Sequence, residues 1–575
     1  MVKKKSENKD IQVRSARRKS ISGLITSLIV IVLLVYISSF KYFRLDLTSD
    51  NRYTLSNQTR KILKNLEDVA HVRVYLEGDL PYDLSRLQKS TREQLEEFRQ
   101  IAGSNLQYEF INPSENPDPG TRKKIYTDLH ERGLSPTNIE HKDEEGGTSE
   151  KIIFPGAIIN YRGRELPVEL LNHSNLPAEI NINNSIQMLE YTFIQAIQNL
   201  SDTVTRKIAF LHGNGELEEY HVHDASKALS KFYQIDRGAI NGQLGILDQY
   251  EAVIIAQPTK PFNEKDKFVI DQYIMNGGKV AWFIDAVDVQ MDSLKYGQTL
   301  AYNRSLNLED QLFRYGARIN YKLIKDVQCN VIPVNTGLAG EKPKWTPAPW
   351  LYYPLVSSNG NHTITNNLNM VKSEFVTPID TVGGNPRVKK SILLNSSKYT
   401  RLVDVPAIIR LEEIKETPDK SAFNNSFQPV AVLLEGTFES IFRNRMYHDL
   451  FPGQKVDFID SSVNTKMIVV SDGDIIKNDV RTTSNGPVIV PLGYDRFTKQ
   501  TFGNKEFIVN AINYLTDETG LIQLRNREFK LRVLDKVKLK EEKVKWQVIN
   551  TVIPILIVLV AGILFNYWRK RKYSA

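Results

Sequence analysis

One short segment gathers residue types that could bind a metal ion or an anion. Residues 212–216, His-Gly-Asn-Gly-Glu, follow an apolar run and precede a helical pattern. Helix N-termini can hold anions, and Glu216 with His221 could supply metal ligands. However, the turn lacks the G-x-G-x-x-G fingerprint, and His221 and His223, two residues apart, face different sides of a helix. An ordinary strand-to-helix turn is the simpler interpretation, and we predict no metal and no cofactor.

A second segment, residues 342–355 (KPKWTPAPWLYYPL), concentrates aromatic side chains among four prolines. Exposed aromatic rings can stack on sugar rings or hold a protein partner. The alternative, which we favour, is that the rings pack a proline-rich insertion onto the body. The residues that could contact a ligand or partner here are Trp345, Trp350, Tyr352 and Tyr353.

Recognisable catalytic motifs are missing from the sequence. The string closest to a P-loop, Gly277-Gly278-Lys279, precedes a strand rather than a helix, so it could not hold nucleotide phosphates. There is no G-x-S-x-G elbow. The single cysteine, Cys329, excludes an intramolecular disulfide and any zinc site built on several cysteines. We therefore predict a protein that is not an enzyme.

The net charge of +8 is concentrated at the two ends of the 575-residue chain. Residues 1–20 carry a net +6 and residues 569–575 a net +4, which leaves residues 21–568 at −2. A nucleic-acid binder spreads basic charge over its folded body, because affinity comes from neutralising phosphates. This distribution argues against nucleic acid as a partner.

Two uncharged stretches of twenty residues, 21–40 and 549–568, could each cross a membrane as a helix. A helix of this length spans about 30 Å, the thickness of the hydrocarbon core. A cleaved signal peptide is the alternative for the first stretch, but it is longer than a typical signal core and has no A-x-A site. Trp546 and Trp568 flank the second stretch, as interfacial aromatics do.

The basic ends place both termini in the cytoplasm by the positive-inside rule. The protein is then an inner (cytoplasmic) membrane protein with two spans and a periplasmic main body. Seven lysines and arginines between residues 530 and 545 oppose this orientation. We keep it because long domains translocate largely regardless of charge and the first helix usually dominates.

Hydrophobic periodicity divides the body into two α/β domains. The first shows the order β-α-β-α-β-β-α, which suggests a thioredoxin-like sandwich without the Cys-x-x-Cys of redox enzymes. In the second, strands alternate with helices from Lys207 onward, which predicts a parallel, doubly wound sheet of flavodoxin type. Apolar runs at 430–434, 467–471 and 488–491 could complete that sheet.

The predicted segments run in order along the chain as follows: a basic cytoplasmic tail (1–20), transmembrane helix 1 (21–40), a juxtamembrane linker (41–65), the first extracytoplasmic domain (66–200), the second extracytoplasmic domain (201–520) with an insertion at about 290–425, a juxtamembrane connector (521–548), transmembrane helix 2 (549–568) and a basic cytoplasmic tail (569–575).

Several of these features together resemble the GldG family, the auxiliary component of a gliding-associated ABC transporter in Bacteroidetes. The resemblance covers essentially the whole chain. It is carried by the segments RLDLT (44–48), YTLS (53–56), AFLHGNGE (209–216) and WLYYP (350–354), together with the terminal span. None of these is a catalytic signature, but their order and the two-span layout make the resemblance fairly specific.

The resemblance implies partners: a polytopic ABC permease and a cytoplasmic ABC ATPase, in a complex associated with gliding motility. It also implies that the second domain is related to a domain of an intraflagellar-transport protein, with a fold similar to glutamine amidotransferases or sugar-binding domains. The amidotransferase nucleophile is missing at the expected elbow, so only the fold is carried over.

Two functions of different class remain. In the first, the protein is a non-catalytic transporter subunit that packs on a permease and binds or relays to a periplasmic protein. In the second, the body is a membrane-tethered hydrolase or carbohydrate-binding module that acts on a glycan independently. Two spans, a large outer body and the missing nucleotide motif favour the first.

Overall fold

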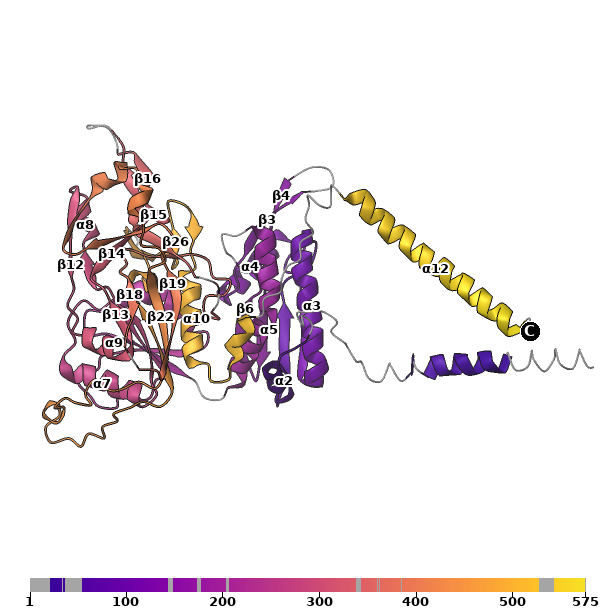
Figure 1. Ribbon diagram of the computed structural model, residues 1–575, viewed down its shortest axis with the longest axis horizontal. Helices are drawn as coiled ribbons and strands as arrows, with labels where there is room; N and C mark the ends of the chain where they lie inside the picture. Colours follow the sequence, from indigo (N-terminus) through magenta and orange to yellow (C-terminus); the bar gives the residue numbers. More distant parts are fainter. Residues whose placement is uncertain are drawn as a thin grey trace, which may run out of the picture. The chain divides into compact units, whose positions relative to one another are not determined.

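The computed structural model describes residues 21–33, 35–36, 54–142, 148–172, 177–202, 206–337, 343–358, 360, 362–383, 385–484, 486–526 and 542–573 (Figure 1). The chain divides into two compact units. One comprises the terminal segments Met1–Thr54 and Phe529–Ala575, and the other is the body Leu55–Glu528.

In the terminal unit, one described helix is long and apolar enough to cross a membrane. This is the stretch Lys543–Arg571 of helix α12 (Lys543–Tyr573), with a mean hydropathy of 2.7 in its most apolar window. Pro554 lies inside α12 and removes one helical N–H donor. The first predicted span is represented by a shorter apolar helix, Ile21–Leu33. Residues 34 and 37–40 of that prediction lie outside the described residues.

The first domain of the body is a four-stranded sheet with the order β2-β1-β5-β6. Strands β1 (Ala70–Val74) and β2 (Leu106–Phe110) are parallel, whereas β5 (Gly156–Tyr161) pairs antiparallel with both β1 and β6 (Arg164–Glu169). Strands β3 (Thr137–Lys142) and β4 (Thr148–Ile153) pair antiparallel with each other in a separate two-stranded sheet. Strand β4 ends at Ile153 and β5 begins at Gly156, so Phe154 and Pro155 separate the two strands.

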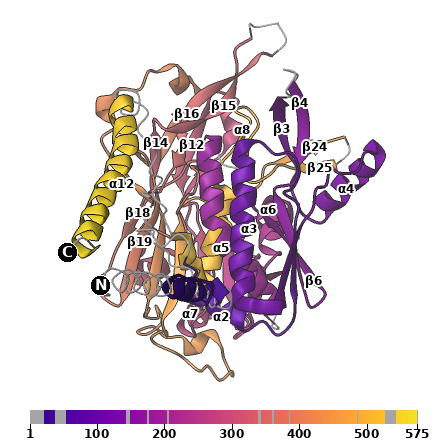
Figure 2. The same cartoon turned by 90° about the vertical axis from the view of Figure 1, so that its right-hand side faces the viewer.

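Helices cover both faces of this sheet. Helices α3 (Tyr82–Ala102) and α5 (Ala178–Ser201) lie side by side on one face, with α2 (Asn57–Lys64) at their ends (Figure 2). Helix α4 (Pro119–Glu131) packs on the other face through Leu129. The predicted order β-α-β-α-β-β-α holds for the elements from β1 to α5, except that the structure adds the strands β3 and β4 between α4 and β5. It also adds α2 before β1.

The second domain is built on a seven-stranded sheet with the order β19-β22-β23-β10-β9-β7-β8. Neighbouring strands from β8 to β23 are parallel, whereas β22 and β19 are antiparallel to their neighbours. The strands are β7 (Lys207–Leu211), β8 (Gln234–Gly238), β9 (Ala252–Ala256), β10 (Lys279–Phe283), β19 (Val388–Asn395), β22 (Pro429–Gly436) and β23 (Thr465–Val470).

This sheet corrects the sequence prediction in two ways. It is mixed rather than wholly parallel, because β22 returns antiparallel beside β23. The run at 488–491 does not join it, because β25 (Gly486–Ile489) forms a separate hairpin with β24 (Val480–Thr483). Helices α6 (Glu219–Leu229) and α10 (Asn504–Thr516) cover one face and α7 (Glu264–Met275) the other, so the sheet is covered on both sides.

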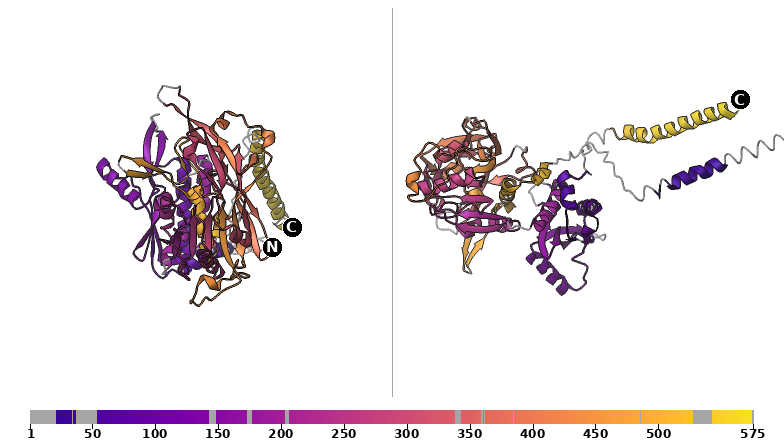
Figure 3. Two further views of the ribbon diagram at one scale, coloured as in Figure 1. Left: turned by 90° about the vertical axis from the view of Figure 1, so that its left-hand side faces the viewer. Right: turned by 90° about the horizontal axis from the view of Figure 1, so that it is seen from below.

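Strands β10 and β23 are parallel neighbours, yet residues 284–464 separate them along the chain. Most of this segment forms small sheets beside the main one (Figure 3). The predicted insertion at 290–425 contains β19, which forms an edge of the main sheet.

The remaining elements are short. They are α8 (Met291–Leu294), α9 (Glu309–Tyr315), β11 (Val287–Val289), β12 (Gln298–Asn303), β13 (Ala317–Ile319), β14 (Lys322–Asp326), β15 (Cys329–Asn335), β16 (Trp345–Val356), β17 (Val371–Lys372), β18 (Ile379–Thr381), β20 (Thr400–Asp404), β21 (Ala407–Arg410), β26 (Tyr494–Asp495), β27 (Gln500–Thr501) and the 3-10 helices η1 (Gly103–Asn105), η2 (Leu411–Lys415), η3 (Lys420–Ala422), η4 (His448–Leu450), η5 (Asp474–Ile476) and η6 (Leu521–Asn526).

Candidate functional site

The side chain of Glu216 closes the glycine-rich turn that follows β7. Glu216 is 91% buried, and its Oε2 accepts a 2.7 Å hydrogen bond from the backbone N–H of Asn214. Gly215 has φ +74°, and a Cβ there would lie 2.0 Å from Thr259 Oγ1, so the turn requires glycine. The backbone N–H groups of Thr259 and Lys260 donate to the carbonyl oxygen of Asn214 at 3.0 and 2.8 Å, which holds the loop between β7 and α6 against the loop after β9.

His221 lies on the first turn of α6 and contacts a different part of the chain. Its Nδ1 is 3.2 Å from the carbonyl oxygen of Asn478, and its own carbonyl accepts from the N–H of Asn478 at 2.6 Å. Glu216 and His221 share no hydrogen bond within the described residues. The structure thus shows each of them in a local packing role, and a ligand contact at either stays a prediction.

Sequence reasoning missed an acidic cluster at the carboxyl edge of the sheet. Carboxylate oxygens of Asp285, Asp472 and Asp474 lie within 4.8 Å of one another. Asp285 follows β10 and Asp472 follows β23, and the carboxyl ends of parallel strands meet at one edge. An aspartate two residues after the end of each of two buried apolar strands was the signal in the sequence that could have found the cluster.

Most oxygens of these carboxylates already accept hydrogen bonds or form ion pairs within the protein. Asp285 accepts from the Gly473 N–H at 2.5 Å and from Gln257 Nε2 at 2.7 Å. The two oxygens of Asp472 accept from the backbone N–H groups of Asp474 and Glu374 at 2.7 and 2.8 Å. Lys477 Nζ lies 2.7 Å from Asp474 Oδ1, and Arg304 Nη1 lies 3.6 Å from Asp285 Oδ2.

Burial dominates the electrostatics of the cluster. Desolvation, with the nearby charge of Asp474, raises the pKa of Asp285 to about 6. The same two effects hold the pKa of Asp472 well above its usual range. A hard divalent cation would find oxygen ligands here, but five of the six carboxylate oxygens already accept hydrogen bonds. The arrangement best fits a network that ties the loops after β9, β10 and β23 together.

The aromatic side chains of residues 342–355 differ in how deeply they are buried. Trp350, Tyr352 and Tyr353 are 1%, 3% and 6% exposed and belong to a core cluster of the insertion, as in the packing alternative. The Lys325 ammonium lies 4.9 Å from the centre of the Tyr352 ring. Trp345, in contrast, is 63% exposed. Of these four aromatic side chains, that of Trp345 is therefore the one that a partner could reach. Such a contact stays a prediction.

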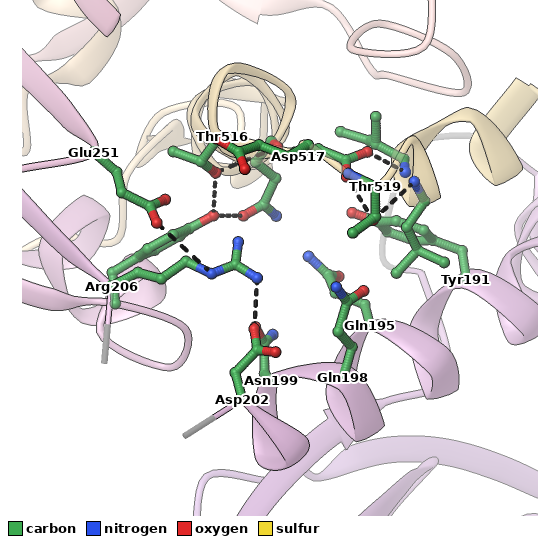
Figure 4. A pocket seen from close by; sticks show the side chains of 15 residues that line it. Tyr191, Gln195, Gln198, Asn199, Asp202, Arg206, Glu251, Thr516, Asp517 and Thr519 are labelled. Carbon is green, nitrogen blue, oxygen red and sulfur yellow. Dashed lines mark hydrogen bonds and ion pairs between the residues drawn. The ribbon is translucent and has the colours of Figure 1, made fainter. Parts of the chain in front are cut away.

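A polar cavity of about 350 Å³ lies between the two domains of the body (Figure 4). Helix α5 forms one wall, and Arg206, Glu251 and the end of α10 with the following turn form the other. Arg206 Nη2 bonds Asp202 Oδ2 at 2.6 Å. Tyr233 Oη donates to Asn513 Oδ1 at 2.8 Å and lies 2.7 Å from Thr516 Oγ1. No local sequence signal predicts this cavity, because its walls come from distant segments.

Comparison with known proteins identifies a family that includes the second domain. The model of a family described as an ABC-type uncharacterized transport system matches residues 205–511, more than half of the chain. The chain belongs to this transport-system family. The match spans the mixed sheet from β7 to α10, together with the insertion. A transport-associated accessory role follows from the family, and the expected resemblance is confirmed at this level.

Other relatives of this transport-system protein give less information. A domain family of unknown function matches residues 49–160. An uncharacterized protein of Borreliella burgdorferi is 20% identical over 570 residues, covering 97% of this chain and 99% of its own. Among solved structures, the mmIFT52 N-terminal domain matches with a TM-score of 0.30 and 11% identity over 54% of this chain and 97% of its own. Exo-beta-1,4-mannosidase Op5Man5 of an Opitutaceae bacterium matches with a TM-score of 0.20 and 10% identity over 67% of this chain and 46% of its own.

Proposed function

We propose that the protein is a non-catalytic, membrane-anchored subunit of an ABC transporter complex. One observation carries the proposal: a chain whose residues 205–511 match the transport-system family also has an apolar helix, Lys543–Arg571, long enough to cross a membrane. In this proposal the helix packs on a polytopic permease, and the body Leu55–Glu528 lies in the periplasm, where it binds or relays to a partner.

ATP hydrolysis must then come from another subunit. The sequence contains no P-loop, and the carboxyl edge of the main sheet is acidic, which disfavours a nucleotide phosphate. A cytoplasmic ABC ATPase is the partner that would supply this chemistry.

Finer assignments belong to the same proposal. Two spans with both termini in the cytoplasm are supported by the basic tails and the apolar helix Ile21–Leu33. A thioredoxin-like first domain is supported by the strand order β2-β1-β5-β6, and a flavodoxin-like second domain by its five parallel strands. A GldG-type role in gliding motility is supported by the sequence segments that resemble that family.

The test is affinity purification of the tagged full-length protein from gently solubilised membranes, followed by mass spectrometry. We expect a polytopic permease and an ABC ATPase in stoichiometric amounts. The control is a full-length chain in which residues 549–568 are replaced by an unrelated transmembrane helix, which should stay in the membrane but lose the permease. Recovery of the protein alone in several mild detergents would overturn the proposal and favour an independent glycan-binding module or hydrolase.

A further inference from the structure

A short segment at the end of the body fills part of the core of the first domain. Residues 517–526, here called the strap, follow α10 of the second domain and include η6. Leu521, Ile522 and Leu524 of the strap are buried. They belong to the hydrophobic core of the first domain, where η6 packs along α5. The strap therefore joins the two domains, because it continues the chain of one and fills the core of the other.

The start of the strap is a tight turn that lines the interdomain cavity (Figure 4). Asp517 Oδ1 accepts from the N–H groups of Thr519 and Gly520 at 2.9 and 3.0 Å. Its Oδ2 accepts from the N–H of Ile522 at 2.8 Å. This turn fixes the direction in which the chain leaves α10 and crosses to α5.

The end of the strap is held by side-chain contacts. The Arg525 guanidinium lies 5.5 Å from the centre of the Tyr191 ring on α5. Its Nε and Nη2 donate to the carbonyl oxygens of Thr363 and Asn366 at 3.4 and 3.5 Å, which is longer than the usual range of about 2.7–3.2 Å. Asn366 Nδ2 donates to the Arg525 carbonyl oxygen, and Asn526 Nδ2 donates to Thr363 Oγ1 at 2.7 Å. Arg525 forms no ion pair with the part of the chain that the structure describes.

The strap is also the last part of the body before α12. A displacement of α12 therefore reaches the body first at Asn526 and Arg525, by the order of residues along the chain. Short 3-10 helices have poorer hydrogen-bond geometry than α-helices, and such peripheral segments open at a lower free energy than the strands of a core. We expect the strap to detach from α5 before the second domain unfolds.

We propose that the strap is a release element, through which a displacement of α12 pulls residues 517–526 off α5 and lets the two domains of the body move relative to each other. This role rests on the membrane anchoring in the proposed function and gives α12 a second task. Its test requires neither permease nor ATPase, so the strap can fail the test while the transporter assignment stands, and the reverse.

Optical tweezers test the order of release. Handles are attached to the full-length protein in detergent through Lys265→Cys on α7 and Lys543→Cys at the start of α12, with Cys329→Ser removing the native thiol. Helix α12 then lies outside the pulled segment. The first event should release about ten residues, or about 35 Å at about 3.5 Å per residue, at a lower force than the unfolding of the second domain. A first event that unfolds the second domain and the strap together would overturn the proposal.

An arginine pair shows whether that event belongs to the strap. Arg525→Leu should lower the force of the first event and leave the later unfolding force unchanged. Arg314→Leu is the matched control, because this arginine of the second domain pairs with Glu439 at 2.6 Å and does not contact the strap; it should leave the first event unchanged. Equal first-event forces in the Arg525→Leu variant and the wild type would contradict the assignment.

Spin labels test the freedom of the domains. Lys89→Cys on α3 and Lys265→Cys on α7 place one label on an exposed position of each domain, again with Cys329→Ser. Double electron–electron resonance should give one narrow distance for the wild-type strap and a broader distribution with Ile522→Asp, which puts a charge into the core beside α5. Arg525→Leu serves if that variant does not fold. An unchanged distribution in the variants that fold would overturn the proposed release.

Discussion

The carboxylate of Glu190 on α5 accepts a 2.6 Å hydrogen bond from Thr59 Oγ1 on α2. The same oxygen accepts from the backbone N–H of Ser56 at 2.9 Å. All three residues are buried. Helix α2 is the first element of the body after the N-terminal apolar segment. Glu190 therefore fixes the start of the body to the helix that also forms one wall of the interdomain cavity.

Removing this carboxylate should loosen α2. Glu190→Ala leaves the Thr59 hydroxyl and the Ser56 N–H without their acceptor, so we expect a loss of about 2–4 kcal/mol in the free energy of unfolding, since each orphaned buried donor costs about 1–3 kcal/mol. Glu190→Gln keeps an acceptor oxygen and should lose less. Urea unfolding of the purified protein measures the loss, and hydrogen exchange of residues 57–64 shows where it occurs. Equal losses in the two variants would contradict this role.

A close backbone approach at the end of β22 makes Gly436 irreplaceable. Its φ is +141°, and a Cβ there would lie 1.9 Å from the carbonyl oxygen of Arg387, just before β19. Gly436→Ala should cost about 3 kcal/mol or more, because the edge of the sheet must shift. Gly453→Ala is the control: φ is +75° but nothing lies within 4 Å of the added Cβ, so only the backbone penalty of about 1–2 kcal/mol is expected. Thermal unfolding compares the two, and similar melting temperatures would rule out the predicted clash.

The acidic cluster predicts a pH dependence with a definite sign. The pKa of Asp285 is about 6 in the folded protein and 3.8 ordinarily, so the folded state binds this proton more tightly. Its contribution to stability is fully present below pH 3.8 and is lost as the pH rises through about 6. Relative to Asp285→Asn, which cannot ionise, the wild type should lose up to about 3 kcal/mol between pH 4 and pH 8, at roughly 1.4 kcal/mol per pKa unit.

Urea unfolding of both proteins across this range provides the measurement. Asp419→Asn is the comparison with opposite sign, because hydrogen bonds from Ser421 lower the pKa of Asp419. The stability contribution of Asp419 should be present above its ordinary pKa and lost as the pH falls. A wild-type curve parallel to that of Asp285→Asn would contradict the predicted linkage.

The two apolar terminal segments should both hold the protein in the membrane. Deleting residues 543–573 should leave the remaining chain attached through residues 21–40, whereas deleting both segments should release it. Alkaline carbonate extraction of membranes followed by immunoblotting distinguishes the outcomes. Release after the single deletion would show that the first segment is not a stable span.

Local signals explain why much of the secondary structure could be predicted. Asp118 accepts from the N–H of Thr121 at 2.7 Å, Pro119 begins α4, and Gly133 with φ +94° follows its end. These are the start and stop residues visible in the sequence. The buried strands β9 and β10 are likewise continuous apolar runs.

The remaining features depend on contacts between distant residues. Strand β8 reads Gln-Ile-Asp-Arg-Gly and has neither an apolar run nor clean alternation, so only its pairing with β7 makes it a strand. Asp285 and Asp472 meet only because β10 and β23 are neighbours in the sheet. The interdomain cavity requires both domains to be folded and packed, and a single segment of sequence cannot show that.

The pairing of β10 with β23 also bears on how the protein is made. Until residues 465–470 emerge from the ribosome, one edge of β10 has no partner from its final fold. An unpaired apolar strand edge is prone to join another chain, and pairing across so long a separation is slow to form. Productive synthesis therefore requires that this edge stay shielded from other chains for as long as residues 284–464 take to follow it.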